Sequence, residues 1–151
     1  LYHRRDQKLG GINVDINNTL KKAISFSKKA GFKFDYIFQL TYKTPFLKSN
    51  DIDSFINLMD IFNTDQVLGV KSEIDRIYKH NGKSLRLLNQ NSTLKLERDE
   101  IYRGIAGIRL FKKKSLNTRE ENKINGHYIL DQKSSHVINT QLDWKIAEAI
   151  A

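Results

Sequence analysis

Two short apolar runs, separated by a helical pattern, constrain the fold more than any other feature of the chain. The runs cover residues 34–40 and 65–70, and turn-forming residues bound each of them, as is typical of strands buried in a parallel sheet. Between the runs, apolar residues recur at helical spacing over 52–59, behind the capping residues 49–51. This order predicts a strand, helix, strand unit with a right-handed crossover, and therefore a layered α/β fold.

The rest of the chain adds helices and strands to this unit. A helix is predicted over 16–30, because Asp15 can cap its first turn and Gly31 can end it. The dipeptide Asn81-Gly82 predicts an antiparallel hairpin. We expect further strands at 104–111 and 127–130, a short basic helix or turn at 112–116, and a last helix over 141–151. No internal repeat or long linker interrupts the series, so residues 1–151 are predicted to form a single domain.

Composition narrows the class of protein. The 151 residues include no Cys, which excludes disulfides, thiolate catalysis and zinc–thiolate sites together. Neither a run of about 18 apolar residues nor an apolar signal core occurs, so we expect no membrane span, no secretory signal and a cytoplasmic location. Lysine and arginine number 26 against 17 aspartates and glutamates, and the resulting charge of +9 calls for anionic partners such as phosphates, carboxylates or nucleic acid.

Two segments are candidates for a functional site. Residues 39–46 follow a predicted strand at its carboxyl end, where open α/β sheets bind their ligands. Their amide, hydroxyl and lysine groups suit a polar anionic substrate, and an ordinary turn closed by Pro45 is the alternative interpretation. Residues 135–148 are the second candidate, although a helix capping box at 140–143 explains part of their pattern. The sequence holds no glycine-rich phosphate loop and no G-x-S-x-G motif, so these residues alone leave an enzyme and a binding module open.

Several stretches of the chain carry a resemblance to a known family. They are Arg4-Arg5 with Leu9, residues 35–41, Thr44-Pro45-Phe46 with 51–53, residues 65–70, and Tyr78-Lys79 followed by Gly82, Leu85, Leu88 and Asn89. The most specific stretch is 138–148, which reads I-N-T-Q-L-D-W-K-I-A-E and looks like the ending I-D-T-x-L-D-hydrophobic-x-I-A-E. Through these residues most of the chain resembles the acylneuraminate cytidylyltransferase (CMP-sialic acid synthetase) family.

The resemblance implies both a fold and an activity. The fold would be a three-layer α/β/α, nucleotidyltransferase-like (Rossmann-like) sheet with an antiparallel hairpin excursion. The activity would be transfer of CMP from CTP to an acidic, sialic-acid-like sugar with release of pyrophosphate, assisted by Mg²⁺ or Mn²⁺ and serving lipopolysaccharide or capsule biosynthesis. The hairpin region, 73–104, would pair two copies into a homodimer.

The resemblance also implies site residues, although it names no catalytic one. Each would act on one part of the reaction. The nucleotide would be bound by Arg4, Arg5, Gln39 and Thr41, the sugar by Gln39, Lys79 and Arg109, and the metal, weakly, by Asn139.

Three departures from the family pattern qualify these expectations. Nothing matches the family's Gly-rich and basic phosphate loop, so we expect the chain to begin inside its domain, without the amino-terminal strand and loop. Val137 and Asn139 stand where the family has two metal-binding carboxylates, and Ile105 and Arg109 replace the usual Asn and Tyr sugar contacts. A catalytically impaired relative is therefore one alternative. A basic nucleic-acid-binding domain is the other, although the lysines at 112–114 lack the aromatic and glycine pattern of an RNA-recognition strand.

Overall fold

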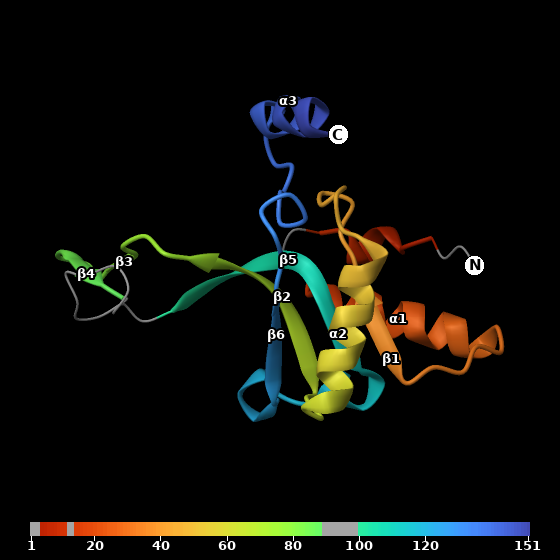
Figure 1. Ribbon diagram of the computed structural model, residues 1–151. Coiled ribbons are helices and arrows are strands. Elements are labelled where there is room, and N and C mark those ends of the chain that lie inside the picture. The colour runs from red at the N-terminus through yellow and green to blue at the C-terminus, as the bar shows by residue number, and fades with distance from the viewer. Residues whose placement is uncertain (1–3, 12–13, 89–99) are drawn as a thin grey trace.

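A four-stranded mixed sheet forms the centre of the molecule (Figure 1). The computed structural model describes residues 4–11, 14–88 and 100–151. Within these residues the α-helices are α1 (Ile16–Lys29), α2 (Ser49–Ile61) and α3 (Gln141–Ile150), and the short 3₁₀ helices are η1 (Gln7–Leu9), η3 (Lys113–Asn117) and η4 (Glu120–Asn122). The strands are β1 (Tyr36–Gln39), β2 (Gln66–Glu73), β3 (Tyr78–His80), β4 (Leu85–Leu87), β5 (Ile101–Lys112) and β6 (Asn125–Ile129). The described chain is therefore a mixed α/β structure, as expected.

The order of strands in the sheet is β1-β5-β2-β6. Strand β5 is antiparallel to both of its neighbours, whereas β2 and β6 are parallel. Strands β1 and β2 thus run in the same direction, as predicted, but they are not adjacent because β5 lies between them. The prediction that 35–40 is a strand buried in a parallel sheet is wrong: β1 is an edge strand, half exposed, and its pairing is antiparallel. Strands β1 and β2 follow each other in the sequence, which favoured their pairing. In the structure the longer β5 lies between them and forms hydrogen bonds with both β1 and β2.

Helix α2 packs on one face of the sheet and provides the centre of the core. Its residues Phe55 and Met59 are fully buried, as the helical spacing predicted. The Phe55 ring lies 5.0 Å from that of Phe38 on β1 and 5.1 Å from that of Tyr128 on β6. The helix begins where the Lys48 amide donates to the Asp51 carboxylate at 2.8 Å, which satisfies one of its free amino-terminal groups.

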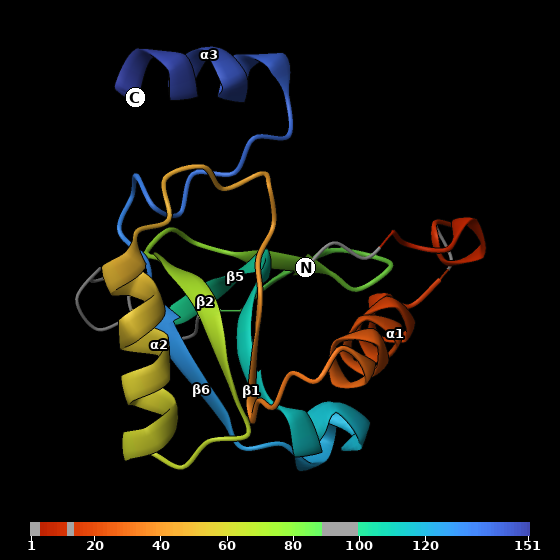
Figure 2. The same ribbon diagram turned by 90° about the vertical axis from the view of Figure 1, so that its right-hand side faces the viewer.

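Helix α1 lies on the other side of the sheet from α2 (Figure 2). As predicted, the Asp15 carboxylate caps it by accepting a hydrogen bond from the Asn17 amide at 2.9 Å, and Gly31 follows its end with φ of 87°. None of its residues is fully buried. Helix α1 therefore covers its face of the sheet only in part.

Two elements project from the sheet. Strands β3 and β4 form the predicted hairpin, well away from the main sheet (Figure 1). Strands β2 and β5 still pair at Glu73 and Ile101, so residues 101–104 belong to the main sheet rather than to the excursion predicted over 73–104. Helix α3 stands at the opposite end of the molecule from the start of β2 (Figures 1 and 2) and leaves Leu142, Trp144 and Ile146 exposed. Among the described residues, no helix is both long and apolar enough to cross a membrane.

The packing of Phe55 gives a test of this core. Replacing Phe55 with Ala removes a fully buried ring and should lower the free energy of unfolding by about 3–5 kcal/mol. The matched control is Phe62→Ala at the end of the same helix, where the ring is 66% exposed and the expected change is within about 0.5 kcal/mol. Urea denaturation followed by circular dichroism measures both, and equal effects of the two substitutions would contradict the described core.

Candidate functional site

A pocket of about 740 Å³ lies at the carboxyl ends of the three strands that share one direction, β1, β2 and β6. Segments that are distant in sequence form its wall: the turn after β1, the end of β2, the first half of β5 and the loop between β6 and α3. The lining residues are Thr41, Lys43, Lys71, Arg103, Gly104, Ile105, Ala106, Gly107, Gln132, Ser135, His136, Val137, Asn139 and Asp143. We call this the carboxyl-end pocket.

The two candidate segments of the sequence meet in this pocket. The Lys43 carbonyl accepts a hydrogen bond from the Ile138 amide at 2.9 Å, and the Lys43 ammonium donates to Asn139 Oδ1 at 3.1 Å. The rings of Phe46 and His136 lie 6.3 Å apart. Segments 39–46 and 135–148 therefore form one structure, although about a hundred residues separate them.

Cations dominate the wall of the carboxyl-end pocket. Lys43 and Lys71 are half-buried, and within the described residues neither pairs with a carboxylate. Arg103 forms an ion pair with Glu73 at the pocket rim. The charge that remains favours an anionic ligand.

The one carboxylate among the lining residues is used by the start of α3. Asp143 accepts hydrogen bonds from the Asn139 amide at 3.0 Å and the Thr140 amide at 2.8 Å, and the Thr140 hydroxyl accepts in turn from the Asp143 amide at 3.2 Å. The bonds that the carboxylate accepts, first from the Asn139 amide and then from the Thr140 hydroxyl and amide, hold the pKa of Asp143 below its ordinary value. The predicted capping box of Thr140 and Asp143 is thus confirmed, and it fixes the segment that carries Asn139.

An irregularity in β5 shapes the wall of the pocket. The pairing of β2 with β5 shifts between Leu68 and Val70, opposite residues 104–109. Within that stretch Gly107 has φ of 81°, and a Cβ atom there would lie 3.0 Å from the Cβ of Thr41. Glycine is therefore favoured on both counts, because it adopts positive φ without strain and because a Cβ atom there would force Thr41 to move by a few tenths of an ångström.

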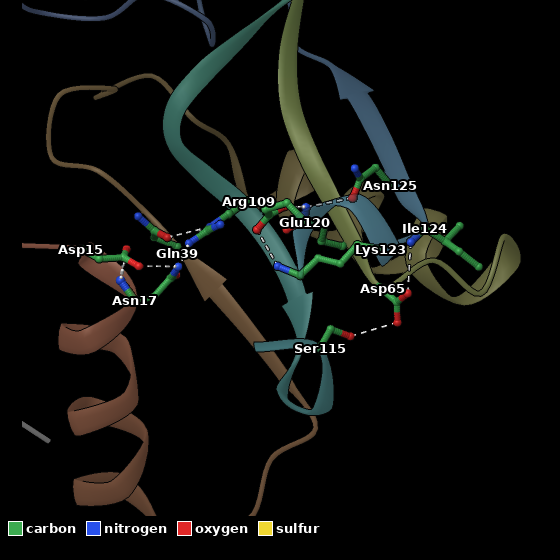
Figure 3. A network of polar contacts seen from close by, with 11 residues as sticks. Asp15, Asn17, Gln39, Asp65, Arg109, Ser115, Glu120, Lys123, Ile124 and Asn125 are labelled. Atoms are coloured by element: carbon green, nitrogen blue, oxygen red, sulfur yellow. Dashed lines mark hydrogen bonds and ion pairs between the residues drawn. The ribbon is translucent and has the colours of Figure 1, made fainter. Parts of the chain in front are cut away.

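A second pocket, of about 460 Å³, lies on the sheet face opposite α2 and shares the wall 104–107 with the first. Arg109 lies in it, where its Nε donates to Gln39 Oε1 at 2.9 Å and its Nη2 to Asn17 Oδ1 at 3.0 Å (Figure 3). The start of α1 and the end of β1 therefore hold the guanidinium in place. We call this the Arg109 pocket.

Further polar contacts continue along the same face (Figure 3). The buried Gln66 donates through Nε2 to Glu120 and to Asn125, both at 2.8 Å. The hydrogen bond from Lys123, more than that from Gln66, lowers the pKa of Glu120. The Gln66 Oε1 atom has no hydrogen-bond partner in the described part of the chain. Polar side chains thus occupy much of a sheet face that an apolar core would otherwise fill.

The structure brings together some of the predicted site residues and separates others. Thr41 and Asn139 line the carboxyl-end pocket, and Gln39 and Arg109 are hydrogen-bonded in the adjoining Arg109 pocket. Arg4 and Arg5 line neither; they border a separate pocket of about 780 Å³ near the start of the chain. Lys79 is exposed on β3 in the hairpin. Their roles stay predictions.

Sequence reasoning did not single out Lys71 and Arg103 as site residues. Both lie within strands, and they face a pocket only because β5 lies beside β2. Lys71 carried one local signal, since it directly follows the buried run that ends at Val70. Arg103 carried none, because its stretch of β5 was not predicted as strand.

The residues at the predicted metal position do not fit a metal held by the protein. Val137 offers no ligand atom, and Asn139 Oδ1 already accepts a hydrogen bond from the Lys43 ammonium at 3.1 Å. No group of three or more His, Cys, Asp or Glu side chains suited to a metal ion occurs among the described residues. We therefore assign no step to a protein-bound metal.

Comparison with known proteins adds no further assignment. No protein-family model matches the chain, and no curated protein matches it either. The family resemblance thus remains a prediction. Arguments about function therefore rest on the geometry of the pockets.

Asp131 provides a test of how the loop between β6 and α3 is held. Its carboxylate accepts hydrogen bonds from the Ser134 amide at 2.6 Å and the Lys48 ammonium at 2.9 Å. These contacts, the Ser134 amide first, lower the pKa of Asp131 from 3.8 to about 2. Because the folded pKa is lower than the unfolded one, this carboxylate stabilises the loop above about pH 4, and the stabilisation is lost as pH falls toward 2.

A carboxyl-detected NMR titration should therefore give Asp131 a midpoint near 2. The variant Lys48→Met removes one of the two contacts and should raise that midpoint toward 3.8. A midpoint of about 3.8 in the unmodified protein would show that the loop is not held in this way.

Proposed function

We propose that the protein is a cytidylyltransferase, which transfers CMP from CTP to an acidic, sialic-acid-like sugar and releases pyrophosphate. One observation carries the proposal. The two segments that most resemble the cytidylyltransferase family, 39–46 and 138–148, lie against each other in a cation-lined pocket at the carboxyl ends of the strands. Ligands of open α/β sheets bind at this end.

The proposed reaction needs positioned charge more than covalent chemistry. The anomeric hydroxyl oxygen of the sugar attacks the α-phosphorus of CTP and loses its proton, while the bond from that phosphorus to the bridging oxygen of the β-phosphate breaks. Negative charge accumulates on the phosphate oxygens and on the departing pyrophosphate, so nearby cations stabilise the transition state. Lys43, Lys71 and Arg103 are the cations of the pocket wall. CTP enters as its Mg²⁺ or Mn²⁺ complex, which makes the metal part of the substrate.

The predicted residues take roles consistent with their positions. Thr41 would contact the nucleotide in the carboxyl-end pocket, and Gln39 with Arg109 would hold polar groups of the nucleotide or sugar in the adjoining Arg109 pocket. The guanidinium of Arg109 suits a carboxylate, because its planar donors match that group. Asn17 fixes the same guanidinium through its Oδ1 atom.

The proposal extends to the fold and the assembly. We propose a three-layer, Rossmann-like arrangement, supported by the positions of α2 and α1 on opposite sides of the sheet (Figure 2). We also propose a homodimer formed through the hairpin, where Tyr78, Leu85 and Leu88 are 48%, 65% and 47% exposed. A two-stranded hairpin is only marginally stable alone, and a symmetric partner would bury these side chains.

The test is release of pyrophosphate by the full-length protein. CTP is incubated with a panel of acidic nonulosonates and Mg²⁺ or Mn²⁺, and ATP, GTP and UTP serve as competing nucleotides. We expect pyrophosphate with CTP and at least one sugar, and a dimer by light scattering of the same preparation. Arg109→Lys should lower kcat/KM by about tenfold or more, because a bidentate or stacked arginine is not replaced by lysine, whereas the exposed Lys114→Ala at the other end of the sheet should leave it unchanged.

Three outcomes would contradict the proposed activity, and a fourth would contradict the proposed dimer. Absence of pyrophosphate with every sugar rejects the activity. Tight CTP binding without turnover favours a catalytically impaired relative. Binding of RNA or DNA whose affinity falls steeply with salt, with no effect of CTP, favours the basic nucleic-acid-binding domain. A monomer at micromolar concentration would reject the dimer alone.

A further inference from the structure

The lining residues of the carboxyl-end pocket differ in charge from those of a site that binds phosphates through a magnesium ion. A site that binds phosphates through a magnesium ion supplies carboxylates for that ion. Here the position next to Lys43 is a neutral amide, Asn139, and the position of Val137 is apolar. The lining residues contribute lysines and an arginine instead.

The pocket's single lining carboxylate is engaged by the start of α3 through its Oδ2 atom. Asp143 accepts hydrogen bonds from the amides of Asn139 and Thr140, and its geometry is that of a helix cap. Moving it toward the pocket would break these bonds and remove one half of the capping box, leaving only the bond from the Asp143 amide to the Thr140 hydroxyl. Asp143 keeps its negative charge, and against it the lining residues set the positive charges of Lys43 and Lys71, while Arg103 is shared with Glu73. The balance of charge at the pocket is therefore positive.

Lys43 is the cation best placed to meet a ligand directly. It is half-buried, and its backbone is anchored because its carbonyl accepts from the Ile138 amide at 2.9 Å. An ammonium has three donor hydrogens, and the bond to Asn139 Oδ1 uses one of them. That bond orients the ammonium without neutralising its charge, since the amide oxygen is uncharged.

We propose that Lys43, supported by Lys71 and Arg103, binds an oxyanion of the substrate directly, so that an ammonium takes the place of a protein-held metal ion. The oxyanion is a phosphate of the nucleotide or the carboxylate of the acidic sugar. Naming these two sources rests on the proposed function, whereas the oxyanion site itself rests on the pocket's geometry alone.

The test is isothermal titration of the full-length protein in low salt and excess EDTA, which removes divalent metals. The probes are inorganic pyrophosphate, for the phosphate source, and N-acetylneuraminate, for the carboxylate source. We expect at least one probe to bind, and Lys43→Met to weaken that binding by about tenfold or more, because a hydrogen bond to a charged group is lost. The probe whose affinity falls identifies the oxyanion.

Three further variants separate charge from structure. Lys43→Arg keeps the charge and should retain most of the affinity. Asn139→Asp places a carboxylate beside the Lys43 ammonium, 3.1 Å away in the present structure, and should weaken binding much as Lys43→Met does, because the new ion pair neutralises the cation. Lys114→Met, on an exposed lysine at the other end of the sheet, should change nothing. Urea denaturation verifies that each variant is folded.

Two results would overturn the inference. One is binding of pyrophosphate and N-acetylneuraminate only when Mg²⁺ is added. The other is binding in EDTA that neither Lys43→Met nor Asn139→Asp affects. Failure of the proposed function is separate, because it is a lack of turnover: binding in EDTA without turnover keeps the oxyanion site, and turnover without binding in EDTA rejects only this inference.

Discussion

Strand β5 pairs with both β1 and β2, and the rest of the structure depends on that pairing. Its residues Ile105, Ile108 and Leu110 are buried in the core against α2. Residues 105–108, between the paired Gly104 and Arg109, leave the regular ladder. Residues 104–107 form a wall that both pockets share. Because β5 contributes to the core and to both pockets, its residues are buried on one side of the strand and accessible on the other.

The placement of β5 also marks the limit of what the sequence could predict. Helices α1 and α2 followed from local signals, since Asp15, Asp51 and the buried pair Phe55 and Met59 are spaced as capped amphipathic helices require. The hairpin followed from Asn81-Gly82. The pairing of β1 with β5 did not follow, because residues more than sixty positions apart leave no mutual signal in a short sequence window. Strand direction was predicted where the crossover helix dictated it, and strand adjacency was not.

The residues of the candidate site were likewise predictable only where a local sequence pattern marked them. Thr41, Lys43 and Asn139 lie in segments that the sequence singled out, because a turn at a strand end and a capping box are local patterns. Lys71 and Arg103 join them through the pairing of β2 with β5, and the only local signal was the position of Lys71 directly after the buried run that ends at Val70. The contact between Lys43 and Asn139 could not be predicted from the sequence either, although each residue lies in one of the two candidate segments. Chemistry that depends on distant contacts emerges only with the fold.

The central claim is that the nucleotide binds in the carboxyl-end pocket, where segments 39–46 and 135–148 meet. A titration of the full-length ¹⁵N-labelled protein with CTP, followed by amide chemical shifts, tests it most directly. The account predicts that the largest changes occur at Thr41, Lys43, residues 104–107 and Asn139, which line this pocket. Changes confined to another surface, such as the pocket bordered by Arg4 and Arg5, would contradict it.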